Sequence, residues 1–164
     1  MQVLIILCNN RKVRKNNGMK IKFFEKDGHI NPEAIYAGIY QFKIGLLNDN
    51  EEKYLPLYIG ESYSMLLRCS NHLYELFHND PSYFGLTEVD LKDDKLQLIV
   101  DIYEKVSLED NISNSDRDIL LREKEMAAIE KLMPLSQNQT NDNLNRNRSA
   151  IVKEAIEKLK LRNK

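Results

Sequence analysis

Two tyrosines with the same small neighbours are the first residues in this chain whose types and spacing could do chemistry. Gly38-Ile39-Tyr40 and Tyr58-Ile59-Gly60 lie in neighbouring apolar segments. A purely structural core would accept valine or leucine in place of either tyrosine, and a buried phenol oxygen needs a hydrogen-bond partner. The pattern therefore indicates that the two hydroxyls are either bonded within a core or at work in a site.

The segment after Gly60 adds a cation and an imidazole. Its apolar residues recur at helical spacing, and a second face carries Arg68, His72 and Glu75. An ordinary solvated face with an ion pair would explain these three residues. However, this helix starts where the segment carrying Tyr58 stops, so Arg68 could reach the same pocket as the tyrosines.

A glutamate on a later helix is harder to explain as a surface residue. At about 100° per residue, Glu125 lies at the middle of the apolar arc of its helix. Glu123 and Glu130 point the other way, where a solvated carboxylate belongs. A carboxylate on a core-facing stripe needs an arginine, a set of hydrogen bonds or a metal to compensate its burial. A structural pair with a buried arginine and a metal site are both open at this point.

Strands and helices that would position these side chains follow from the hydrophobic pattern. Apolar runs bounded by turn residues predict strands over 19–28, 34–44, 54–60 and 95–106. Helical periodicity and capping residues predict helices over 64–79, 116–133 and 149–164, the last capped by Ser149. Pro56 indicates an edge strand or a bulge, and the Asn- and Gln-rich run 136–149 is typical of exposed loop. We expect a small α/β domain with a three-stranded, mostly antiparallel central sheet flanked by helices, plus insertions.

Composition and charge narrow the class of protein. The chain has 164 residues, of which 42% are hydrophobic and 30% charged, as in a soluble globular domain. Its net charge of −1 gives no global basic field, so a polyanion site would be a local patch. Cys8 and Cys69 form no disulfide framework, which favours a reduced, cytoplasmic setting. The opening run VLIILC is too short to span a membrane and precedes its basic residues, so we expect a short strand there, and Met19 is an alternative start.

Taken in order, these residues resemble the GIY-YIG nuclease family, which includes homing endonucleases, a bacterial excision-repair subunit and some restriction enzymes. The two tripeptides, then Arg68 and His72, then a helical Glu125 followed by Pro134 and an asparagine, match its ordered motifs. Glu125 is the position at which that family binds metal. Residues 41–57 and the segment from His72 to Glu125 are longer than the family pattern. The asparagine falls one place late, so either Gln137 or Asn138 could hold that role.

The resemblance implies three parts of the chain and a chemistry. Residues 1–33 would be an N-terminal extension with short strands, 34–140 the nuclease domain, and 141–164 a polar linker with a C-terminal basic amphipathic helix. The implied activity is phosphodiester hydrolysis of DNA by a metal-dependent endonuclease, of restriction type or associated with a mobile element or phage. One Mg²⁺ or Mn²⁺ on Glu125 would hold a phosphate oxygen.

The resemblance also assigns roles to the other site residues. Arg68 would clamp the phosphate, and Tyr40 would be the general base, assisted by Tyr58 and His72. Lys43, Lys53 and Asn138 would contact substrate.

Other classes of function stay open at this stage. A catalytically silent nucleic-acid-binding relative would bind DNA with strong salt dependence and not cut it, and a protein-interaction module would do neither. Among active forms, a monomer would nick one strand, and a homodimer would cut both. No partner in a membrane is expected.

Overall fold

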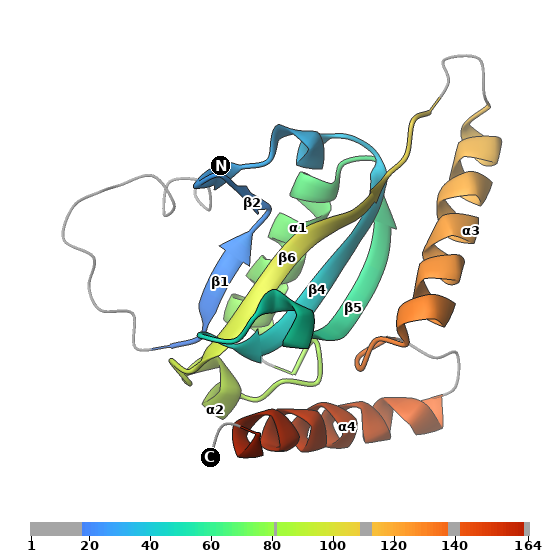
Figure 1. Cartoon of the computed structure of the whole chain (residues 1–164). Coiled ribbons are helices and arrows are strands. Elements are labelled where there is room, and N and C mark those ends of the chain that lie inside the picture. Colours follow the sequence, from blue (N-terminus) through green and yellow to red (C-terminus); the bar gives the residue numbers. More distant parts are fainter. Residues whose placement is uncertain (1–17, 81, 109–112, 138–141, 163–164) are drawn as a thin grey trace.

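The computed structural model describes residues 18–80, 82–108, 113–137 and 142–162 (Figure 1). Its strands are β1 (Lys20–Phe23), β2 (Glu25–Lys26), β3 (His29–Ile30), β4 (Gly38–Leu46), β5 (Leu55–Ser62) and β6 (Leu96–Lys105). Its α-helices are α1 (Met65–Tyr74), α2 (Glu88–Leu91), α3 (Asn114–Leu132) and α4 (Asp142–Leu161). Short helical turns are η2 (Pro32–Ile35), η3 (Glu51–Lys53) and η4 (Glu75–Asn79), the last a π-helical continuation of α1.

The central sheet has four strands in the order β1-β6-β4-β5. The strand β4 pairs antiparallel with both β5 and β6, so the expected antiparallel three-stranded core is present. The strand β1 pairs in parallel with β6 and makes the sheet mixed. A separate hairpin joins β2 to β3 through Asp27 and Gly28, whose φ angles of 53° and 77° form the predicted turn. The protein is thus a mixed α/β fold.

Both faces of β4 are covered, as its apolar sequence predicted. On one face, Tyr40 and Phe42 pack in a large apolar core with residues of α1 and α4. On the other face, Ile39 and Ile59 pack against Ala128 of α3. Figure 1 shows α1 behind the sheet, α3 beside the β5 edge and α4 across one end. Alternation along β4 and β5 therefore decides which side chains meet α1 and which meet α3.

The strand β5 is an edge strand, and its pairing with β4 shifts register between Phe42 and Lys43, opposite Pro56. Both features predicted from Pro56 are confirmed. The outer side of β5 is covered by the chain that follows α3. The backbone N–H groups of Leu135 and Ser136 donate to the carbonyls of Pro56 and Leu57 at 3.0 and 2.8 Å. The edge is thereby protected where the proline cannot donate.

The N-termini of the two site helices differ in their capping. Ser64 occupies the N-cap position of α1 but makes no side-chain capping hydrogen bond. Ser113 caps α3 by accepting a hydrogen bond from the backbone N–H of Asp116. The helix α3 ends at Met133, whose left-handed φ of 46° turns the chain into Pro134.

The predicted start of the last helix at Ser149 is wrong. The helix α4 begins at Asp142, so Ser149 lies in its interior and residues 142–148 are not a loop. The Asn-rich composition favoured a loop, but Val152, Ile156 and Leu159 anchor the helix in the core. Once a helix is nucleated by such packing, extending it toward its N-terminus costs little.

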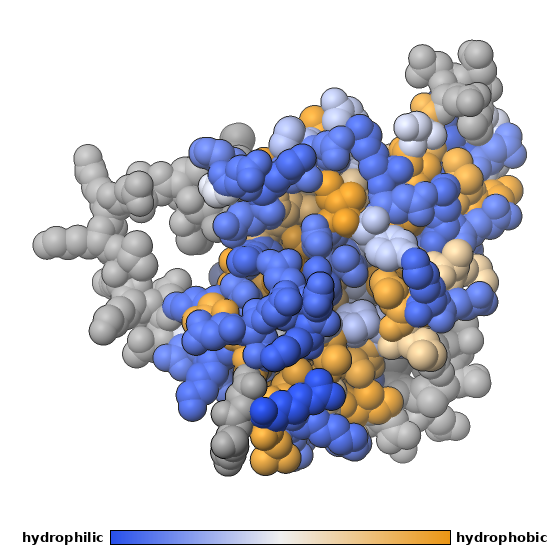
Figure 2. All heavy atoms as spheres, viewed as in Figure 1, coloured by the Kyte–Doolittle hydropathy of each residue, from blue (hydrophilic) through white to orange (hydrophobic). Residues whose placement is uncertain are grey.

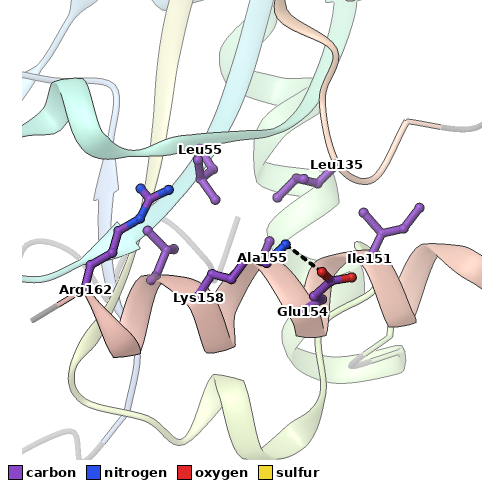
Figure 3. A pocket seen from close by; sticks show the side chains of 8 residues that line it. Leu55, Leu135, Ile151, Glu154, Ala155, Lys158 and Arg162 are labelled. Carbon is purple, nitrogen blue, oxygen red and sulfur yellow. Dashed lines mark ion pairs between the residues drawn. The ribbon is translucent and has the colours of Figure 1, made fainter. Parts of the chain in front are cut away.

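A hollow of about 190 Å³ separates α4 from β5 (Figure 3). Leu55 and Leu135 face the helix across it, and Lys158 pairs with Glu154 on the helix at 2.6 Å. Elsewhere, Lys160 pairs with Asp93 at 2.6 Å. The basic face predicted for this helix is thus partly neutralised within the protein.

Hydrophilic side chains cover most of the face shown in Figure 2, with apolar patches between them. None of the helices in the described ranges is long and apolar enough to cross a membrane. Cys69 is buried and unpaired. Cys8 and the strand expected at residues 3–8 lie outside the described residues.

Candidate active site

The two glycine–tyrosine tripeptides meet because β4 and β5 are antiparallel neighbours. Tyr40 lies opposite Gly60, and Gly38 lies opposite Ser62. The phenol of Tyr40 passes over Gly60 so closely that a side chain there would collide with it. Gly38 is constrained in a similar way, because a Cβ atom would lie 2.4 Å from the backbone oxygen of Glu104 on β6. The glycines therefore make room for the site, and each tyrosine lies beside them on the α1 face.

His72 lies at the centre of the aromatic cluster and is 3% exposed. Its Nε2 atom is 2.7 Å from the Tyr40 hydroxyl, and its Nδ1 atom is 2.9 Å from the Tyr83 hydroxyl. Burial, with the positive charge of Arg68, lowers the pKa of His72 to about 4. The imidazole is therefore neutral at pH 7, with one nitrogen donating and the other accepting.

Both tyrosines of the tripeptides are protonated at neutral pH in this environment. Burial is the main cause that raises the pKa of Tyr40 far above its usual range. Burial, then the charge of Glu125, raises the pKa of Tyr58 to about 12. Their rings are 6.4 Å apart, and Tyr58 also packs against His72 at 5.4 Å. Neither hydroxyl is a ready base without further help.

Arg68 supplies the positive charge of the site. Its positive charge lowers the pKa of Tyr40 against the larger effect of burial, and it also interacts electrostatically with Tyr58 and Tyr83. The side chain is exposed, so the guanidinium can also meet a ligand. Arg68, His72 and Glu75 line one cavity of about 390 Å³, to which Asn71, Tyr74 and Tyr83 also contribute.

Glu125 faces the core side of α3, as its periodicity predicted. Its neighbours Leu121 and Ala128 are buried, whereas Glu123 and Glu130 are exposed. The carboxylate is half-buried and interacts with the backbone and the charge of Glu61, near the end of β5. Burial and then the charge of Glu61 raise the pKa of Glu125, while Arg122 and Arg68 oppose that rise.

Glu61 is a second carboxylate that the sequence reasoning missed. Burial and the charge of Asp118 raise its pKa, and Arg68 and Arg122 lower it. A signal for it was present: Ile59 and Glu61 are two residues apart on β5, so they share the face that meets α3. The charge of Glu61 acts on Glu125, and the charge of Glu125 acts on Tyr58. Within the described part of the chain, no group of three or more candidate ligands could hold a metal ion.

The three predicted substrate contacts are not brought to this cluster. Lys43 pairs with Asp101 at 3.3 Å, and its side chain is 16% exposed. Lys53 lies in η3 at the opposite end of the β4–β5 hairpin, about 20 Å from Tyr40 at about 3.4 Å per strand residue. Asn138 lies outside the described residues. Gln137, the alternative to Asn138, accepts a hydrogen bond from the backbone N–H of Ile59 at 3.2 Å.

Tyr83 is the other residue that sequence reasoning missed. It belongs to the long segment between His72 and Glu125. Because that part of the segment is irregular, no periodic pattern in the sequence could predict its contact with His72. The site thus contains three tyrosines, an arginine, a neutral histidine and two carboxylates around the last residues of β5. Such a set can bind an anion, orient a water molecule and move a proton.

Comparison with known proteins returned no match to a protein-family model, to a curated protein or to a solved structure. The family resemblance seen in the motifs stays a prediction.

Proposed function

We propose that this protein is a GIY-YIG-type nuclease, a metal-dependent endonuclease that hydrolyses phosphodiester bonds in DNA. One observation carries the proposal: the Tyr40 phenol lies 2.7 Å from Nε2 of His72 and within electrostatic reach of Arg68, and Tyr58 and Glu125 lie within electrostatic reach of each other. The five motif residues of the resemblance come from two strands and two helices. Their convergence supports a site that acts on one group.

Arg68 would bind the scissile phosphate. Its planar guanidinium can donate two parallel hydrogen bonds to phosphate oxygens, and it stays charged at any working pH. The charge that builds on those oxygens during attack would be stabilised by the same contacts. Because Arg68 also interacts with Tyr40, the phosphate and the phenol would lie close to one another.

Tyr40 would take a proton from the attacking water. Arg68 favours the ionised phenol, but burial opposes it more strongly, so the proton of Tyr40 must pass to a neighbour as the water attacks. His72 is that neighbour, at 2.7 Å. Tyr58 would orient the water or a phosphate oxygen with its own hydroxyl.

The carboxylates fit a hard divalent cation. Mg²⁺ commonly binds one or two carboxylates, keeps several waters and takes its remaining ligands from phosphate. Glu125 would hold the ion, and Glu61 is close enough that a cation would relieve the repulsion that raises the pKa of Glu125. When bound, the cation would supply a Lewis acid for a phosphate oxygen.

The direct test is digestion of supercoiled plasmid with Mg²⁺, Mn²⁺ or chelator, followed by sequencing of the ends. We expect cleavage with either metal and none with chelator. Nicked circles alone would indicate a monomer, and linear product at once would indicate a homodimer. DNA binding without cleavage would overturn the enzyme assignment, and absence of salt-dependent binding would overturn DNA as the partner.

A further inference from the structure

Tyr40 faces a chemical difficulty in the proposed reaction. To accept a proton from water, its oxygen must give up the proton it already carries. Burial raises the pKa of this phenol so far that a standing phenolate is excluded at neutral pH. The proton must therefore leave Tyr40 in the same step in which another arrives.

His72 can receive that proton only if it releases another. Its Nε2 atom is 2.7 Å from the Tyr40 hydroxyl, but the ring is buried and Arg68 is close. An imidazolium would be strongly disfavoured there, as the lowered pKa of about 4 records. A neutral ring that gains a proton at Nε2 and loses one at Nδ1 avoids the charge.

Tyr83 is placed to accept at Nδ1. Its hydroxyl lies 2.9 Å from that atom, and its side chain is only half-buried and lines the cavity of about 390 Å³ beside Arg68. The hydroxyl thus bridges the buried imidazole and a space large enough for water.

The segment that carries Tyr83 is held on both sides. The adjacent Phe84 is buried and packs against Phe42 and Tyr58 at 4.8 and 5.1 Å. Gly85 has a φ of 74°, and its close neighbours are Val152 and the Arg148 backbone of α4. A turn closes through the Gly85 N–H and the Ser82 carbonyl at 2.7 Å. Tyr83 is therefore fixed by packing, which a precise contact with His72 requires.

We propose that Tyr83 is a positioning residue that holds His72 in its Nδ1–H tautomer and carries the Tyr40 proton out to solvent. This inference rests on the proposed nuclease function. As the water oxygen bonds to phosphorus, the bond to the leaving oxygen breaks and that oxygen keeps the electron pair. The water proton moves to Tyr40, the Tyr40 proton to Nε2, the Nδ1 proton to Tyr83, and the Tyr83 proton to water in the cavity.

This relay leaves every protein group neutral. His72 ends as its Nε2–H tautomer, and both tyrosines end as phenols. After the product has left, a proton can return from the cavity along the same path. Tyr40 then releases one proton to water in the emptied site, and His72 regains its starting tautomer. The neutral His72 and the protonated tyrosines of the free site are the species that the relay needs.

The tautomer is measured first, in the full chain without DNA. Nitrogen-15 NMR of the His72 ring, assigned by its loss in His72→Gln, should show the proton on Nδ1 with Nε2 as acceptor. In Tyr83→Phe, Nδ1–H has no acceptor, so the ring should shift to Nε2–H and donate to Tyr40. A wild-type ring found as Nε2–H would overturn the relay, because the Tyr40 hydroxyl would then donate elsewhere, for example to Tyr58.

Single-turnover cleavage is measured second. Tyr83→Phe should lose about 10²-fold in rate, at the low end of proton-transfer effects, with its Kd for DNA unchanged. Tyr74→Phe removes the hydroxyl of another tyrosine at the same cavity, one that packs on His78 instead, and should cleave at the wild-type rate. A fully active Tyr83→Phe overturns the relay and leaves the nuclease function standing. A wild-type protein that does not cut DNA overturns both.

Discussion

The phenol oxygen of Tyr40 fills the space that a side chain on Gly60 would need. A Cβ atom on Gly60 would lie 2.3 Å from that oxygen and 2.5 Å from the carbon that bears it. Real Cβ contacts are never so short, so one of the two residues would have to move. The last glycine of the second tripeptide and the tyrosine of the first are thus one steric unit, joined across β4 and β5.

Gly60→Ala should therefore disable the site without touching a reacting group. The methyl would push the Tyr40 ring from His72 and Arg68, at a cost of about 1–3 kcal/mol for overpacking. Cleavage should fall about 10²-fold or more, as for loss of a proton carrier. In a Tyr40→Leu background the same change should cost almost no stability, since the clashing atoms are gone. Wild-type melting and cleavage by Gly60→Ala would contradict this close approach.

Removing the two hydroxyls one at a time separates their roles. Tyr40→Phe leaves Nε2 of His72 without its partner and should cost about 1–3 kcal/mol of unfolding free energy. Its cleavage rate should fall about 10²–10⁴-fold. Tyr58→Phe is expected to lose rate in the same range with a smaller loss of stability, because Tyr58 is half-buried. Melting temperature and rate are measured on the same samples; near-normal cleavage by Tyr40→Phe would end its role as general base.

His72 predicts how stability depends on pH. Its folded pKa of about 4 is below the unfolded value of 6.5, so the unfolded chain binds the proton more readily. The free energy of unfolding is therefore highest above pH 6.5. It falls by about 3 kcal/mol in all as the pH is lowered toward 4. Urea unfolding between pH 7 and pH 4 measures this slope. His72→Gln should remove it, and His78→Gln, at an exposed position, should retain it.

Local pattern was enough to predict much of the site. Alternation along β4 and β5 places Tyr40 and Tyr58 on one face, and antiparallel pairing then brings them together. Helical periodicity gave the inward direction of Glu125, because the buried neighbours Leu121 and Ala128 are on the same stretch of helix. Each of these inferences uses residues within one element or in adjacent ones.

Contacts between distant segments were beyond such reasoning. The parallel pairing of β1 with β6 joins residues that no local period relates. Tyr83 reaches His72 from an irregular segment whose position depends on Phe84 and on α4. The start of α4 was misjudged because packing overrides an Asn-rich composition. The position of Glu61 is different, because its spacing of two residues from Ile59 along β5 was enough to predict that it faces α3.

Glu125 gives the sharpest prediction, because its two explanations predict opposite effects on stability. Burial and Glu61 raise its pKa, so the fold favours the protonated carboxyl. Its contribution to stability is greatest below the ordinary carboxyl pKa of 4.5 and is lost as the pH rises through the higher folded pKa. At neutral pH the ionised group is therefore a cost. Glu125→Gln should raise the melting temperature at pH 7 in metal-free buffer, and the gain should shrink as the pH is lowered.

A structural pair with Arg68 predicts the reverse, since Glu125→Gln would leave a charge uncompensated and destabilise the fold by several kcal/mol. Burial, Glu61 and Arg122 affect the pKa of Glu125 more than Arg68 does. On the metal-site explanation, Mg²⁺ should raise the melting temperature of the wild-type protein and not of Glu125→Gln. Cleavage by the variant should fall to background while DNA binding persists. Glu123→Gln and Glu130→Gln, on the exposed side of α3, should cut normally, and cleavage by Glu125→Gln in Mg²⁺ would rule out the proposed mechanism.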